Sequence, residues 1–210
     1  MKKLIIAILL CLTITDAWAS NFEKIDKIPD NMKSVMVVIP IYSQKIAFRL
    51  PTSWKPAFQD KKPNFYIIEF TPKNENINSW QEMLTVQGFQ NLAGRVTPHK
   101  FISDLAMRFK AVCGSDAIFE SIGEKSIDGY QSYSAILGCA KVPNQNLSEI
   151  GYYIAIQGEK DLYLIQKANR KAALSSNKSF HGQANASSFM ENFMPIELCK
   201  KGGAQGECNK

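Results

Sequence analysis

Hydrophobic residues along the chain change their spacing several times, and each spacing predicts a different element. Three short runs rich in β-branched and aromatic residues come first, at residues 35–39, 46–50 and 65–70. Pro40, Pro51 and Pro72 follow these runs closely. Apolar runs of this length that end at proline are typical of buried strands. The first third of the chain therefore predicts three strands.

A helix is predicted next, over residues 79–94. Ser79 and Glu82 have the spacing of a capping box, in which each side chain accepts a hydrogen bond from the other residue's backbone N–H. Gly94 is a suitable residue to end the helix. One face of this predicted helix carries Trp80, Met83, Leu84 and Gln87.

A second helix has clearer signals. Thr97 is a favourable cap, Pro98 suits the first turn, and Gly114 marks the end. The apolar stripe consists of Phe101, Ile102, Leu105, Phe109 and Val112. Apolar residues at this spacing predict a helix that packs one face on a core.

After residue 114, apolar residues recur at every second position, which is typical of strands. Four successive antiparallel strands are predicted at residues 118–122, 130–142, 150–157 and 162–167. In the second of these, Tyr133, Ala135, Leu137 and Cys139 share one face, which we take to be the inner one. Residues 169–185 are polar, and their few apolar residues have no regular spacing, so this segment predicts a long loop. A short helix is expected from Ser188 to the residue before Pro195.

This order predicts an α+β fold in which helices pack on an antiparallel sheet. We place one α+β domain at residues 34–198 and a looped tail at residues 199–210. The length of 210 residues and the composition, 45% hydrophobic and 21% charged, fit one globular domain. They exclude collagen, coiled coils and multi-span membrane proteins.

The first nineteen residues have the features of a secretory signal peptide. Lys2 and Lys3 precede a nine-residue apolar run, and Ala17 and Ala19 supply the small residues before a cleavage site. The run is less than half the roughly 20 residues that span a membrane, and Leu10 disfavours lipidation of Cys11. We therefore expect residues 1–19 to be removed, residues 20–33 to be a lead-in segment, and the protein to be periplasmic or secreted. An uncleaved N-terminal anchor is the alternative.

Four cysteines remain after this cleavage, and an even number in an exported chain favours disulfides. Three pairings are formally possible. We prefer Cys113–Cys139 with Cys199–Cys208, because each links neighbours in sequence. A four-cysteine zinc site is the competing interpretation, but it favours paired C-x-x-C spacing, which this chain lacks.

Aromatic and strand-edge motifs occur in three segments: Phe48-Arg49-Leu50-Pro51 with Trp54, Ile68-Glu69-Phe70-Thr71-Pro72, and Asn78-Ser79-Trp80-Gln81-Glu82-Met83-Leu84. These motifs resemble those of a known family of small exported proteins. The family has the α/β/α sandwich fold of PsbP, an extrinsic protein of the photosynthetic oxygen-evolving complex. The resemblance covers residues 45–167, and it also extends to secreted proteins of unknown function from Legionella-like bacteria. It implies a binding or assembly factor, and it carries over no catalytic residue.

Candidate catalytic residues are few. The chain has two histidines, of which His99 is expected on the helix surface and His181 lies in the polar loop. No G-x-S-x-G elbow, phosphate-binding loop or clustered set of metal ligands is present. We therefore predict no enzyme activity, no cofactor and no metal site. A hydrolase that uses His181, or a distant pair of carboxylates of the glycosidase kind, is the alternative.

The chain carries 25 Lys and Arg against 19 Asp and Glu, a formal charge of +6. The nearest basic cluster includes Lys167, Arg170, Lys171 and Lys178, and it lacks the interleaved aromatic residues of a nucleic-acid site. We expect no specific nucleic-acid binding. The predicted binding residues are Arg170, Lys171, Lys178 and His181.

Together these features favour an exported, non-enzymatic binding module that contacts a partner protein or an anionic surface, in the manner of a type II secreted effector. The alternative is a structural or accessory subunit of a cell-envelope or secretion assembly. The sequence does not specify the oligomeric state.

Overall fold

The computed structural model describes residues 32–177, 186–201 and 208. The predicted signal peptide at residues 1–19 lies outside the described residues, as does most of the lead-in segment at residues 20–33. All elements described below belong to the unit that begins at Lys33.

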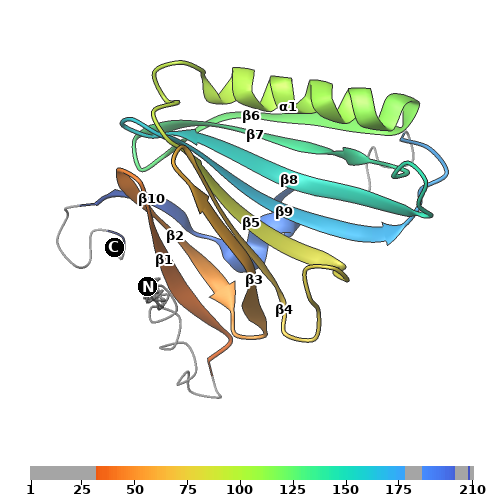
Figure 1. The fold of residues 1–210 in the computed structure, drawn as a ribbon, viewed down its shortest axis with the longest axis horizontal. Helices are drawn as coiled ribbons and strands as arrows, with labels where there is room; N and C mark the ends of the chain where they lie inside the picture. Colours follow the sequence, from red (N-terminus) through yellow and green to blue (C-terminus); the bar gives the residue numbers. More distant parts are fainter. Residues whose placement is uncertain (1–31, 178–185, 202–207, 209–210) are drawn as a thin grey trace, which may run out of the picture. The chain divides into compact units, whose positions relative to one another are not determined.

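A seven-stranded antiparallel sheet forms the centre of this unit, in the order β3-β4-β5-β9-β8-β7-β6 (Figure 1). Its second half is a meander of long strands, as the period of two predicts. The four strands predicted from residue 118 onward are confirmed, and three of them extend further than expected. The bounds are Trp54–Lys62 (β3), Phe65–Pro72 (β4), Glu82–Phe89 (β5), Ala117–Ile127 (β6), Tyr130–Cys139 (β7), Leu147–Gln157 (β8) and Leu162–Ala172 (β9).

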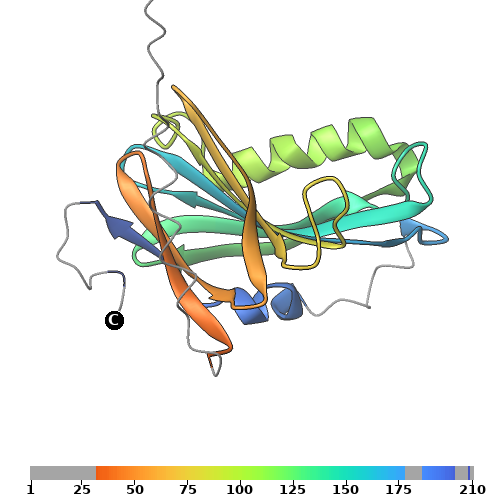
Figure 2. The same ribbon diagram turned by 60° about the horizontal axis from the view of Figure 1, so that its bottom comes forward.

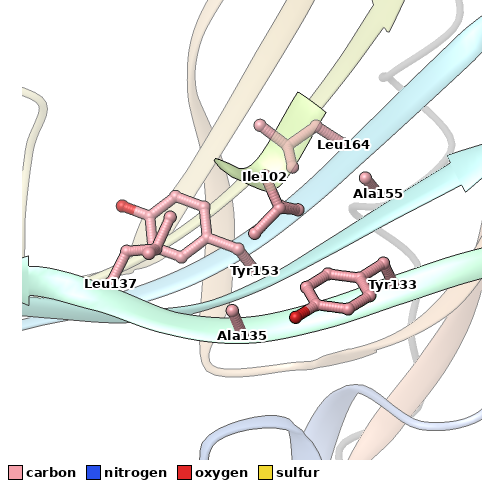
Figure 3. Packing of buried hydrophobic residues seen from close by; sticks show 7 residues of the cluster. All are labelled: Ile102, Tyr133, Ala135, Leu137, Tyr153, Ala155 and Leu164. Carbon is pink, nitrogen blue, oxygen red and sulfur yellow. The ribbon is translucent and has the colours of Figure 1, made fainter. Parts of the chain in front are cut away.

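The predicted second helix is confirmed as α1, Pro98–Cys113. The Thr97 side chain accepts a hydrogen bond from the backbone N–H of Lys100 at 3.2 Å, and Gly114 follows the last turn with a positive φ of 59°. α1 lies across one face of the large sheet, over β6 and β7 (Figure 1). The predicted inner face of β7 supplies the core beneath it, as Figure 3 shows. That cluster is Ile102, Tyr133, Ala135, Leu137, Tyr153, Ala155 and Leu164.

The opposite face of the large sheet is covered by a second, smaller sheet of order β1-β2-β10 and by a short helical segment (Figure 2). The Phe48 and Phe70 rings meet edge to face between the sheets, 5.7 Å apart. The bounds are Ser34–Ile41 (β1), Gln44–Pro51 (β2), Ala186–Met190 (α2), Glu191–Phe193 (η5) and Ile196–Lys200 (β10). The fold is therefore predominantly antiparallel β with one long helix. The expected helix layer on the second face is a three-stranded sheet instead.

The helix predicted over residues 79–94 is wrong, because this segment contains strand β5. β5 pairs with β4 on one side and β9 on the other, and four consecutive residues from Met83 to Val86 are buried. A strand in the middle of a sheet that is covered on both faces has apolar side chains on both sides. Its apolar run therefore also fits a helical face, which explains the wrong assignment.

Besides β5, two further strands were not predicted. β3 contains Pro56 and a run of polar residues, and it forms an edge of the large sheet, where proline and charged residues are tolerated. Its register shifts between Pro56 and Phe58. β10 lies partly within the predicted tail at residues 199–210. Its Leu198 donates its backbone N–H to Asp128 at 2.9 Å.

A buried carboxylate joins the two sheets. Asp161 is 1% exposed and lies in the turn before β9. It accepts hydrogen bonds from the backbone N–H and the hydroxyl of Ser43, which lies between β1 and β2. It also accepts the backbone N–H of Asn91 at 2.8 Å and the Tyr163 hydroxyl at 3.4 Å. Burial raises the pKa of Asp161, but these donors outweigh burial and the net pKa lies below its ordinary value.

Both preferred disulfides are confirmed. Cys113 at the end of α1 is bonded to Cys139 at the end of β7, and Cys199 in β10 is bonded to Cys208. Two disulfide bonds suggest an oxidising compartment outside the cytoplasm. In the described ranges, no helix has the length and apolar character that a membrane span requires.

Candidate functional site

A cavity of about 640 Å³ lies at one end of the interface between the two sheets and is closed on one side by α2 and η5. This volume is within the usual range of ligand sites. Residues from seven segments line it: Lys33, Ser34, Arg49, Pro51, Ser53, Trp54, Glu82, Ser148, Ile150, Lys167, Asn169, Lys171, Leu174, Ser188, Phe189, Glu191, Asn192 and Phe193.

Strand β9 supplies a polar row to this cavity. Lys167, Asn169 and Lys171 alternate along the strand and so project from the same face of the sheet. In the neighbouring strands, Ser148 is in register with Lys171, and Glu82 is in register with Asn169. The face that packs on the small sheet thus changes from apolar to polar toward the end of β9.

Lys167 is the most buried charge of the cavity, with 3% of its surface exposed. Its ammonium group donates to the Glu82 carboxylate at 2.8 Å, to the Asn169 side-chain oxygen and to the Ala168 carbonyl at 3.5 Å. It also lies 5.4 Å from the centre of the Trp54 ring, within cation–π range. Burial lowers the pKa of Lys167, and the Glu82 carboxylate partly offsets this shift.

Three further cationic side chains line the cavity: Lys33, Arg49 and Lys171. All three residues are exposed, so we call them the rim cations. With Lys167 they give four positive groups against two carboxylates, Glu82 and Glu191. The cavity therefore carries a surplus of two positive charges, which attracts anions.

An aromatic pair gives the cavity a rigid apolar wall. The Trp54 and Phe193 rings meet edge to face with their centres 5.0 Å apart, and both residues are buried. Phe189 from α2 and Ile150 from β8 extend this wall. A cavity with positive charge, amide and hydroxyl groups and an apolar wall suits an anionic group attached to an apolar body.

Two of the predicted binding residues, Arg170 and Lys171, lie in the described part of the chain. Both line a second pocket, together with Trp80 and Asn146. Lys171 also lines the cavity, but the adjacent Arg170 projects from the other face of the sheet. There the Arg170 guanidinium binds the Glu149 carboxylate at 2.9 Å and stacks 3.8 Å from the centre of the Trp80 ring. Lys178 and His181 lie outside the described residues.

Other candidate chemistry is sparse in the parts of the chain that the structure describes. His99 is exposed at the start of α1, as expected, and its ring lies 4.6 Å from that of Tyr133. One set of potential metal ligands comes together, Glu197 with Cys199 and Cys208. Their two sulfur atoms form a disulfide bond and are therefore not thiolate ligands.

Lys171 is the one residue of the cavity lining that was among the predicted binding residues. Lys167 was noted only as part of the basic cluster. Lys33, Arg49, Trp54 and Glu82 come from segments distant in sequence, so only the fold brings them together. One sequence signal could have pointed to the cavity. Polar residues at 167, 169 and 171 continue the same face as the apolar Tyr163 and Ile165, which indicates a strand whose inner face becomes polar.

No family model and no curated protein matches the chain. Among solved structures, it is similar to a protein from Bacteroides thetaiotaomicron, with 10% identity over 82% of this chain, a TM-score of 0.44, and 51% of that chain covered. This chain thus spans about half the length of that protein. It is also similar to the Saccharomyces cerevisiae Ran-binding protein Mog1p, with 8% identity, 77% and 95% coverage and a TM-score of 0.46. The third is the Synechocystis PsbP protein, with 14% identity, 74% and 94% coverage and a TM-score of 0.41.

Proposed function

We propose that this protein is an exported, non-enzymatic binding module that takes an acidic group of a partner protein into the cavity between its sheets. The observation that carries the proposal is the surplus of positive charge around a concave, partly aromatic site. We also propose that the protein acts in the periplasm or outside the cell, as a type II secreted effector does. The signal-like N-terminus and the disulfides support this export.

The concave shape favours a discrete acidic group over a flat anionic surface. Lys167 is deep in the cavity, where a planar membrane surface does not reach, whereas an acidic side chain or chain end can enter. The rim cations are exposed and suit the first, long-range attraction of such a group. Because exposed charges are screened by salt, we expect binding to weaken as the salt concentration rises.

Binding of an acidic peptide should depend on the rim cations. In calorimetric titrations of the oxidised chain from Ser20 with a hexaglutamate peptide, the double variant R49Q/K171Q is expected to bind about two- to thirtyfold more weakly. This estimate assumes that each exposed charge pair contributes on the order of 0.2–1 kcal/mol. The control R108Q/K125Q removes the same charge from exposed residues of α1 and β6, outside the cavity lining.

Equal weakening of both double variants would show that the peptide responds only to net charge, and it would refute the cavity as the site. Phosphatidylglycerol vesicles provide the second arm of the experiment. If the protein bound these vesicles but not the peptide, an anionic surface would replace the acidic partner in the proposal.

A further inference from the structure

The contact between Lys167 and Glu82 is unequal in its burial. The Lys167 side chain is 4% exposed, whereas the Glu82 side chain is 52% exposed. Lys167 projects from the middle of β9, and Glu82 is the first residue of β5. A buried ammonium thus binds a carboxylate that remains half in water.

The buried ammonium requires an anion, because an uncompensated charge in a protein interior is costly. Two of its acceptors, the Asn169 side chain and the Ala168 carbonyl, are neutral and belong to its own strand. Among the hydrogen-bond acceptors that the structure describes for Lys167, Glu82 is the one that carries a negative charge. The Glu75 carboxylate adds a weaker electrostatic attraction. Glu82 is also the acceptor that can be exchanged at little cost when another anion takes its place at Lys167, since its carboxylate is half exposed and readily solvated.

We infer that Lys167 is the residue that anchors a carboxylate of the ligand, and that this carboxylate displaces Glu82 from Lys167. This inference rests on the proposed function, because it assumes that the cavity binds an anionic group. Glu82 then acts as an internal competitor that sets the affinity, and the ligand is identified by class as a carboxylate with an apolar body.

Charge balance distinguishes a carboxylate from other ligands. Exchange of one carboxylate for another keeps the ammonium neutralised, whereas a neutral amide leaves it without a counter-charge. A phosphate monoester brings nearly two negative charges toward Glu82 and Glu191, which also line the cavity. The Trp54 ring beside the ammonium offers an apolar surface for the rest of the ligand.

The test uses phenylacetate, with phenyl phosphate and phenylacetamide as probes of similar size. Binding to the oxidised chain from Ser20 is followed by NMR shifts of the backbone amides around the cavity. We expect phenylacetate to bind best. E82Q should bind it about two- to fivefold more tightly, which is the expected effect of removing an exposed competing carboxylate. K167M should bind it at least about tenfold more weakly.

The matched control is E149Q, which removes a carboxylate from an ion pair on the other face of β9 and should leave phenylacetate binding unchanged.

K167M leaves Glu82 half in water, so this variant is expected to fold. If it does not fold, the rise in affinity of E82Q for phenylacetate tests the displacement of Glu82 by itself. If wild type bound phenylacetate and E82Q bound it no more tightly, the displacement of Glu82 would be overturned, but the cavity would remain the binding site. Stronger binding of phenyl phosphate would overturn the carboxylate class. Absence of shifts around the cavity with any anion, in wild type and in E82Q, would overturn the proposed function as well.

Discussion

Replacing Asp161 by alanine is expected to lower the free energy of unfolding by about 3–5 kcal/mol, as buried polar networks do when one partner is removed. The substitution leaves three donors without their acceptor: the backbone N–H and hydroxyl of Ser43 and the backbone N–H of Asn91. It also removes one of the connections between the β1–β2 hairpin and the large sheet, whereas the hydrogen bond from the Tyr163 hydroxyl to the Ile41 carbonyl remains. Urea-induced unfolding of both proteins, followed by circular dichroism, measures the difference.

The matched control for this variant is Asp104→Ala, which removes an exposed carboxylate that pairs with Lys100 on α1. Such a surface pair contributes about 0.5 kcal/mol. If both variants lost the same small amount of stability, the role assigned to Asp161 as the connection between the sheets would be wrong.

The contribution of Asp161 should also depend on pH. Its pKa in the folded protein lies below the ordinary value of 3.8, so the folded state favours the ionised form. The stabilisation is therefore complete above that ordinary value and is lost as the pH falls through the lower folded pKa. The difference in stability between wild type and the alanine variant should shrink below about pH 4. A difference that grew on acidification would contradict the assigned direction of the shift.

Removal of the Cys113–Cys139 disulfide is expected to cost about 3.5 kcal/mol, because the bond closes a loop of 26 residues in the unfolded chain. The double variant C113S/C139S should melt about 10 °C lower than wild type. Differential scanning calorimetry under non-reducing conditions measures this change.

The comparison variant is C199S/C208S. Its bond spans a sequence separation of 9 residues, so the same chain-entropy argument gives a smaller loss, about 2.5 kcal/mol. A larger loss from the shorter loop, or no loss from either variant, would contradict the entropic account of these bonds.

Local patterns predicted α1 and the strands from β6 to β9. α1 has a polar face and an apolar face, so its helical period could be recognised. Strands β7, β8 and β9 are buried over most of their length, and the glycine and polar residues between them indicated where each strand ends. The buried run of β5, from Met83 to Val86, instead follows a Ser79–Glu82 spacing that fits a helix cap, so the segment was assigned to a helix. Its apparent capping box is also not formed as expected, since Glu82 binds Lys167. Tertiary pairing decided the structure of this segment.

The site was predictable only in part, for a geometric reason. The basic cluster along β9 was visible, but adjacent residues in a strand project to opposite faces, so Lys171 lines the cavity and Arg170 does not. The residues that complete the cavity, Arg49 from β2 and Glu82 from β5, meet β9 only after the two sheets pack. The sequence therefore indicated the charge but not the cavity.

The most direct test of the central claim is a map of where an acidic ligand binds. The oxidised chain from Ser20, labelled with ¹⁵N, is titrated with hexaglutamate, and the amide shifts are assigned to residues. We predict the largest shifts at Ser148, Asn169 and Lys171, which line the cavity, with α1 unaffected. Shifts confined to α1 or the β6 edge, with none around the cavity, would contradict the account.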